Sequence, residues 1–134
     1  MKSLEEIRKI FSDDLYATQA TGIEIDDVSE NYAKCSLKLE RKHKNAAGSI
    51  MGGVMFTLAD FTFAVATNAT NPITVTTVSQ ISFLNSPKGD TLYAESRLLK
   101  DGRNACFYEI SISDNLGTPV AFVSVSGAHI KPKA

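Results

Sequence analysis

The feature that most constrains this chain is an apolar run without proline, which begins at Val54 and ends at Ala66. It lies within the stretch 45–68, which reads NAAGSIMGGVMFTLADFTFAVATN. Apolar side chains fall on nearly every face of the helix that this run predicts, and such a helix is enclosed by the rest of a protein. The run is too short, and its threonines too polar, for a membrane span. We therefore expect one long central helix.

One carboxylate, Asp60, interrupts the run. A buried carboxylate is costly unless it is paired, hydrogen-bonded or open to a cleft. Asp60 is therefore either a surface acid facing water, with Thr57 or Thr62 beside it, or a base or nucleophile in a site. The pair Gly52-Gly53 also has two interpretations: close packing at the helix start, or backbone N–H groups that stabilise developing negative charge. Acyl-transfer chemistry needs both a base or nucleophile, which a carboxylate can supply, and such donors for the developing oxyanion.

Gly52 and Asp60 are 8 residues apart, which places them roughly 12 Å from each other along one helix. One small carbonyl group cannot contact both. If they share a site, the two groups come from two copies of the helix, as in a two-fold dimer with antiparallel helices. The spacing thus predicts an active site at a subunit interface.

Three segments of the stretch form a longer pattern: Asn45-x-x-Gly48, Gly52-Gly53 and Leu58-Ala59-Asp60. This pattern resembles the motif N-x-x-G-x-x-H-G-G-x-x-x-x-L-A-D of the hotdog-fold acyl-CoA thioesterases, in particular of the PaaI-like group. The resemblance extends from about Gly22 to the C-terminus. Met51 stands where the family has histidine, so the backbone donor of Gly52 is kept while a side chain beside the thioester is lost.

The resemblance implies an α+β hotdog fold, with a curved, antiparallel six-stranded sheet wrapped around the long helix and a short N-terminal helix. It also implies the strand order 1-2-4-5-6-3, in which the strand from Ile73 is the edge that pairs across a homodimer. Relatives are often tetramers, so we expect this dimer to assemble into a homotetramer. The implied substrate is a coenzyme A thioester, and neither a cofactor nor a metal is expected.

Site roles follow from the same resemblance. Asp60 is expected to act as base or nucleophile and the Gly52 N–H as oxyanion donor. Asn45 is expected to hold a water near the thioester carbonyl, with a turn-former as the alternative, and the Thr77 hydroxyl to lie near the carboxylate. Arg103 matches a position near the nucleotide of coenzyme A, whose phosphates need cations. The other residues expected to contact the substrate are Gly48, Met51 and Gly53.

Composition sets outer limits on the function. The chain has 134 residues, of which 43% are hydrophobic, and a formal net charge of −1. This length suits one domain over residues 1–134, and the near-neutral charge argues against bulk nucleic-acid binding. The N-terminus lacks an apolar signal segment, so we expect a cytoplasmic protein that does not bind membranes. Cys35 and Cys106 lack metal-ligand spacing and are expected to be reduced, buried thiols.

The rest of the chain predicts a second helix and six strands. Ser3-x-x-Glu6 fits a capping box at the start of an amphipathic helix over residues 3–16. Strands are expected at 22–30, 31–41, 73–84, 91–99, 104–113 and 119–130, the last four after a break at Asn71-Pro72. Short turns join these last four strands, which favours an antiparallel meander. His43, in a basic turn at 41–44, is interpreted as a solvated histidine rather than a base.

Three classes of function are compatible with these patterns. The leading one is hydrolysis of a small or medium acyl-CoA. A hotdog hydratase needs an aspartate and a histidine in one site, and neither His43 nor His129 stands at a matching position. A non-catalytic acyl-CoA-binding module is the third class, favoured by Met51. The acyl group is not identified, because Phe56, Phe61, Phe63 and Phe83 could line a pocket, although core positions are expected for them.

Overall fold

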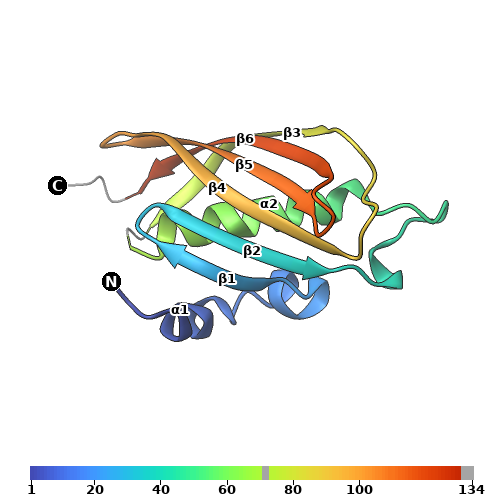
Figure 1. Cartoon of the computed structure of the whole chain (residues 1–134). Helices are drawn as coiled ribbons and strands as arrows, with labels where there is room; N and C mark the ends of the chain where they lie inside the picture. The colour runs from blue at the N-terminus through green and yellow to red at the C-terminus, as the bar shows by residue number, and fades with distance from the viewer. Residues whose placement is uncertain (71–72, 131–134) are drawn as a thin grey trace.

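A computed structural model describes residues 1–70 and 73–130 and shows a six-stranded antiparallel sheet that curves around one long helix (Figure 1). The helix is α2, Gly52–Asn68. The strands are β1 Glu24–Ser29, β2 Tyr32–Lys38, β3 Thr74–Phe83, β4 Thr91–Asp101, β5 Ala105–Asp114 and β6 Pro119–His129. Their order in the sheet is β1-β2-β4-β5-β6-β3. The expected fold class, long helix and strand order are confirmed. The break expected at Asn71-Pro72 lies outside the described residues.

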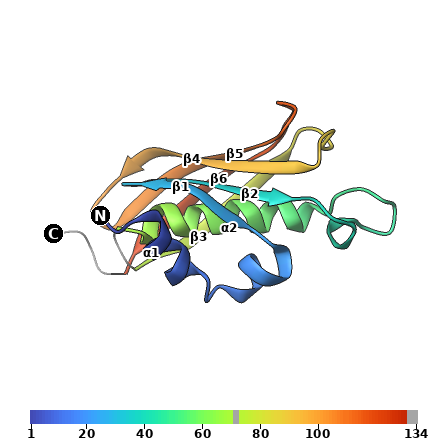
Figure 2. The same ribbon diagram turned by 60° about the horizontal axis from the view of Figure 1, so that its bottom comes forward.

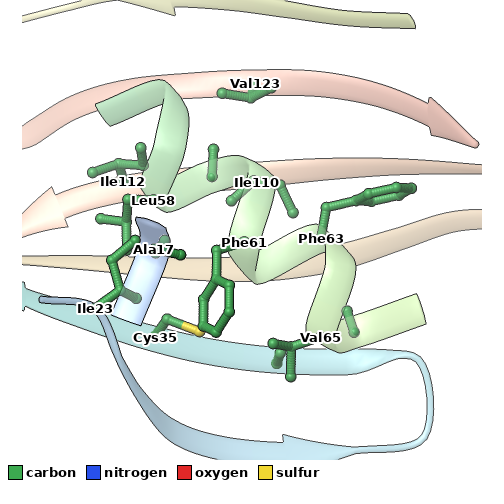
Figure 3. Packing of buried hydrophobic residues seen from close by; sticks show 14 of the residues in the cluster. Ala17, Ile23, Cys35, Leu58, Phe61, Phe63, Val65, Ile110, Ile112 and Val123 are labelled. Carbon is green, nitrogen blue, oxygen red and sulfur yellow. The ribbon is translucent and has the colours of Figure 1, made fainter. Parts of the chain in front are cut away.

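The core lies between α2 and the concave face of the sheet. Leu58, Phe61 and Phe63 of α2 are at most 3% exposed and pack against strand residues that include Cys35 and Ile110 (Figure 3). The Phe63 and Tyr108 rings meet edge to face, with centroids 5.4 Å apart. The apolar run thus forms the enclosed helix that its sequence predicts, and the phenylalanines at 61 and 63 are core residues. Cys35 and Cys106 are both buried, as expected, and within the described residues neither forms a disulfide.

The meander predicted from turn lengths holds for β4, β5 and β6 but not for β3. Strand β3 pairs with β6, from Thr74 opposite His129 to Phe83 opposite Ala121. The chain then crosses from the edge strand to β4 through residues 84–90, which form a longer connection than a hairpin turn. Strand β3 is therefore an edge of the sheet, and most of its side chains are exposed.

The N-terminal helix is shorter than predicted. Helix α1 spans Leu4–Phe11 and begins with the expected capping box between Ser3 and Glu6. It ends there because Ser12 caps it: the Ser12 N–H bonds to the Arg8 carbonyl and its hydroxyl to the Lys9 carbonyl, a competition with the helix that is typical of serine and aspartate. A short π-helix, η1 Tyr16–Thr21, follows and was not predicted. Figure 2 shows this blue segment on the side of α2 opposite β4–β6.

No helix within residues 1–70 and 73–130 is long and apolar enough to cross a membrane.

Candidate active site

One face of α2 is left uncovered by the sheet. Gly53 and Asp60 are exposed and Thr57 and Ala64 are half-buried, in contrast to their neighbours Leu58 and Thr62. The four positions are spaced by three or four residues, so they form one stripe along the helix. The helix is thus enclosed on every side but this one. Asp60 is on the surface of the single chain, beside Thr57, while Thr62 is buried and bonds to the Leu58 carbonyl.

Asp60 lines a cavity of about 300 Å³ between α2 and residues 14–17, which lead into η1; we call it the Asp60 cavity. Its walls are Asp14, Leu15, Tyr16, Ala17, Thr57, Asp60, Phe61 and Ala64. Partial desolvation, and to a lesser degree the negative charge of Asp14, raise the pKa of the Asp60 carboxyl above its usual value. A carboxylate whose proton is held more tightly, at the edge of a cavity, is suited to take up a proton from water.

The N-terminus of α2 lacks a capping side chain. Met51 occupies the cap position, is 49% exposed and makes no side-chain cap bond. Within the described part of the chain, the N–H groups of Gly52 and Gly53 have no hydrogen-bond acceptor. Unpaired N–H groups at the positive end of a helix are able to bind an anion or a developing oxyanion.

The two glycines at this terminus differ in their surroundings. A Cβ atom on Gly52 would come within 2.7 Å of the Phe83 ring, whereas one on Gly53 would meet nothing within 4 Å. Close packing therefore explains the glycine at 52 but not the one at 53. Gly52 lines a second cavity, of about 410 Å³, together with Met55 and Phe83. Phe83 is 55% exposed and is thus not the core residue that we expected.

The loop before α2 is held by Asn45. Its side-chain oxygen accepts the N–H groups of Ala47 and Ser49, at 3.0 and 3.1 Å. Gly48 follows with φ +86°, a conformation that favours glycine. Asn45 therefore does form a turn, the alternative considered for it. Its side-chain NH₂ group makes no hydrogen bond within residues 1–70 and 73–130 and stays available for the predicted role with water.

His43 corrects a prediction, because it is buried rather than solvated, with 3% exposure. Its Nδ1 accepts the Glu40 N–H and its Nε2 lies 2.8 Å from the Thr21 carbonyl oxygen. Nδ1 is thus the acceptor, and Nε2 carries the proton that it donates to Thr21. The His43 carbonyl accepts the Met51 N–H. The ring therefore ties the end of η1 to the loop that leads into α2.

Thr77 and Arg103 are not among the residues that line the Asp60 cavity in one chain. Thr77 occupies a bulge in β3, where its hydroxyl donates to the Ser126 carbonyl at 3.0 Å. Arg103 is exposed in the β4–β5 hairpin, at the opposite end of the molecule from the start of α2 (Figure 1). Gly52 and Asp60 line separate cavities. A single chain thus brings Asp60 together with Thr57 and Asp14, but not with Gly52 or Arg103.

The resemblance also implies that the N-terminal helix, expected over residues 3–16, can close the acyl end of the pocket. No side chain among residues 14–17, however, marks the Asp60 cavity in the sequence, and the structure places Tyr16 and Ala17 in η1 rather than in that helix. The T-shaped contact of Phe11 with Phe61, with centroids 5.9 Å apart, is a signal only after the fold is known.

Comparison with known proteins decides the family. A family model described as the thioesterase superfamily matches residues 47–121, which include α2 and most of the sheet. The chain belongs to the thioesterase superfamily. It is also 30% identical to the acyl-coenzyme A thioesterase PaaI of Escherichia coli K12 over 121 residues, covering 90% of this chain and 86% of that protein. These relatives confirm the expected PaaI-like family and the class of enzyme, a thioesterase.

Further relatives of this thioesterase-family chain agree in fold. The structure of the E. coli PaaI protein from the phenylacetic acid degradation operon superimposes with a TM-score of 0.83, covering 98% of this chain and 99% of that chain at 26% identity. A Streptococcus mutans protein bound to acetyl CoA gives a TM-score of 0.77 at 25% identity, over 84% and 91%. A protein of Archaeoglobus fulgidus, named only as a candidate esterase, is a relative by sequence at 27% identity. The match covers 71% of this chain and 62% of that protein.

Proposed function

We propose that this protein hydrolyses small or medium acyl-CoA thioesters at a site shared by two copies of the chain. Asp60 acts as base or nucleophile, and the Gly52 N–H of the other copy stabilises the oxyanion. In the base route, Asp60 takes a proton from water and the hydroxide adds to the carbonyl carbon. The C–S bond then breaks and Asp60 returns the proton to the leaving thiolate, which releases coenzyme A and a carboxylic acid. The observation that carries the proposal is the Asp60 carboxylate, with a raised pKa, on the uncovered face of a helix that is otherwise enclosed.

Three arrangements support a composite site. Gly52 and Asp60 line separate cavities of one chain, in keeping with their separation of roughly 12 Å along α2. Strand β3 offers an unpaired sheet edge through which two copies can pair. The β4–β5 hairpin, which carries Arg103, lies at the end of the molecule remote from the start of α2 (Figure 1), which favours a coenzyme A site that uses Arg103 of one copy and Gly52 of the other. A homodimer is thus the functional unit that we propose, and a homotetramer remains a prediction for light scattering to test.

The hydratase alternative loses support because both histidines have other partners. His43 bonds to Thr21 and Glu40, and His129 lies between Asp101 and Thr74, 2.8 Å from each. Neither lines the Asp60 cavity. The non-catalytic module differs from the thioesterase in one measurable respect: it binds acyl-CoA without releasing thiol. A thiol-release screen over aliphatic and aryl acyl-CoAs separates these two functions directly.

Mixed dimers test the composite site. Asp60→Asn removes the carboxylate and Gly52→Pro removes the backbone donor, in a Phe83→Ala background that leaves room for the new ring atoms. Gly52 has no positive φ, so its backbone permits proline. Refolding the two variants as an equal mixture makes about half of the dimers mixed, and each mixed dimer contains one intact site. We expect about a quarter of the activity of the Phe83→Ala control to return.

Two controls complete the experiment. Circular dichroism must show that each variant folds, and subunit exchange must be confirmed with differently tagged chains. Were both groups of a site to come from one chain, every site in a mixed dimer would carry one lesion. No activity would then return, and the composite site would be wrong.

A further inference from the structure

The Asp60 cavity has one wall whose role the proposed chemistry does not explain. This wall consists of residues 14–17, which come from the N-terminal segment, whereas the other wall is the uncovered face of α2. Its volume, about 300 Å³, is at the lower end of the range of roughly 300–1,000 Å³ that is common for ligand pockets. The cavity therefore suits a small group, such as the acyl part of a thioester held near Asp60.

The local backbone sets this wall in place. Helix η1 is a π-helix, a rare wide turn that is frequent at functional sites. It places Ala17 in the core at 8% exposure, while the preceding Leu15 and Tyr16 remain 56% and 72% exposed although they line the cavity. The end of η1 is fixed by the bond of the Thr21 carbonyl to buried His43. The wall is thus anchored, and two of its apolar side chains lack covering groups within the single chain.

Asp14 is the only charged residue on this wall. Its backbone groups bond to Phe11 and Thr18, but within the described residues its carboxylate makes neither a hydrogen bond nor an ion pair. The side chain therefore has no structural task in the segment. Among the residues that line the cavity there is no lysine, arginine or histidine. Within the described part of one chain, the formal charge on the lining residues is therefore all negative and comes from Asp14 and Asp60.

We propose that Asp14 is a specificity-determining residue, which makes the Asp60 cavity accept uncharged acyl groups and reject acyl groups that end in a carboxylate. This inference rests on the proposed function of Asp60. A carboxylate at the tip of the acyl group would be a third negative charge in a cavity whose lining residues in one chain include no cation. The uncharged acyl group avoids this repulsion and packs against Leu15, Phe61 and Ala64.

The expected size of the effect of Asp14 on acyl-group preference follows from the exposure of its side chain. Asp14 is exposed, so water and salt screen its charge, and its removal should change the preference between a charged and an uncharged acyl group by about fivefold. This change in preference should become smaller as the ionic strength rises. The carboxylate of Asp14 also contributes to the raised pKa of Asp60, after the larger effect of desolvation. Removing it should therefore move the acid limb of the kcat/KM profile to lower pH.

Succinyl-CoA and 4-oxopentanoyl-CoA form a matched pair for the test, because a methyl ketone replaces the carboxylate without changing the length of the acyl group. The ratio of kcat/KM for succinyl-CoA to that for 4-oxopentanoyl-CoA is measured in the wild type, Asp14→Asn and Asp14→Ser. Asp13→Asn is the matched control, because it removes a neighbouring exposed carboxylate that does not line the cavity. We expect a rise of about fivefold in both Asp14 variants and none in the control.

The same preference is measured a second time as binding. Each of the two thioesters is used as a competitive inhibitor of the best substrate of the screen, and the ratio of their inhibition constants is compared among the variants. An unchanged ratio in both Asp14 variants, or an equal rise in Asp13→Asn, would overturn the charge preference. If the wild type hydrolyses neutral thioesters and only the ratio fails to move, the proposed hydrolysis stands and Asp14 has no such role. If the wild type releases no thiol from any acyl-CoA, the proposed function fails and this inference fails with it.

Discussion

Asp60 and Asp114 are two aspartates of one chain with opposite environments. Asp114 is 3% exposed and its two oxygens accept four backbone N–H groups, those of Lys88, Gly89, Leu116 and Thr118. Burial alone would raise its pKa, but these donors outweigh burial and hold the pKa of the carboxyl well below its usual value. Asp60 is only partly desolvated, has no hydrogen-bond donor within residues 1–70 and 73–130, and its pKa is raised.

The difference separates a structural carboxylate from a reactive one. Asp114 joins the β3–β4 connection to the β5–β6 turn, so its ionised form is part of the folded structure. The ionised form of Asp60 receives no such support from its own chain, and its basicity is therefore kept for a reaction. Four predictions test this contrast.

The largest effect is expected for Asp60→Asn, which keeps the shape of the side chain and removes the base. We expect kcat on the best acyl-CoA to fall by at least about 100-fold. Because the pKa of Asp60 is raised in the fold, its ionised form does not stabilise the folded state, and the melting temperature should barely change. Turnover close to that of the wild type in the folded variant would show that Asp60 is not catalytic.

Asp114→Asn should have the converse effect, on stability rather than chemistry. The amide turns one acceptor oxygen into a donor that faces backbone N–H groups, and the melting temperature should fall by roughly 5 °C or more. Since the folded pKa of Asp114 is lowered, its stabilisation is present above the unfolded pKa of about 3.9 and is lost as the pH falls below it. Acid titration followed by circular dichroism should therefore show a weaker pH dependence below about pH 4 in the variant. An unchanged acid transition would contradict the assignment.

Asn45→Asp separates the two roles of Asn45. The carboxylate keeps an oxygen for the N–H groups of Ala47 and Ser49 but lacks the NH₂ group. If that group holds the attacking water, kcat should fall by about tenfold with little change in melting temperature. Asn45→Ala serves as the control, because it also loses the turn and should lower the melting temperature. Full activity in Asn45→Asp would leave the residue a turn-former only.

The smallest effect is expected for Met51→His. If the histidine of the family polarises the carbonyl, restoring it beside the Gly52 donor should raise kcat/KM on a small acyl-CoA by about threefold. Met51 is half exposed at the cap of α2, so the change should not disturb the fold. Equal or lower activity would indicate that the pocket has adapted to methionine.

The sequence predicts the elements whose pattern is local. The apolar run from Val54 to Ala66 marks α2, which extends two residues beyond it at each end, and Ser3 and Glu6 mark the start of α1. It does not predict contacts that depend on distant partners. His43 is buried against the Thr21 carbonyl, which lies 22 residues away in the chain. Asp114 is a structural residue because the connection from β3 to β4 brings the N–H groups of Lys88 and Gly89 to its carboxylate. Residues 114–117 by themselves indicate only a turn.

The candidate site shows the same difference between features with a local sequence pattern and features that depend on distant parts of the chain. Asp60 and the helix N-terminus follow from one stretch, because both lie on one predicted helix. The place of β3 beside β6 came only from the resemblance, since turn lengths favour a neighbour in sequence. The resemblance implies that the N-terminal segment closes the acyl end of the pocket, but the residues of this wall, 14–17, could not be identified, because a π-helix carries no periodic pattern of its own.

The separate origin of this wall affects how the protein can change over evolutionary time. The segment before β1 is held in place by four buried residues, Ile7, Ala17, Thr21 and Ile23, whereas residues 14–16 are all exposed, on the side of α2 opposite β4–β6 (Figure 2). Substitutions at positions 14–16 therefore disturb neither the helix that carries Asp60 nor the strands that support it. New acyl preferences can arise by drift in one short surface segment, while the hydrolytic groups remain under independent selection.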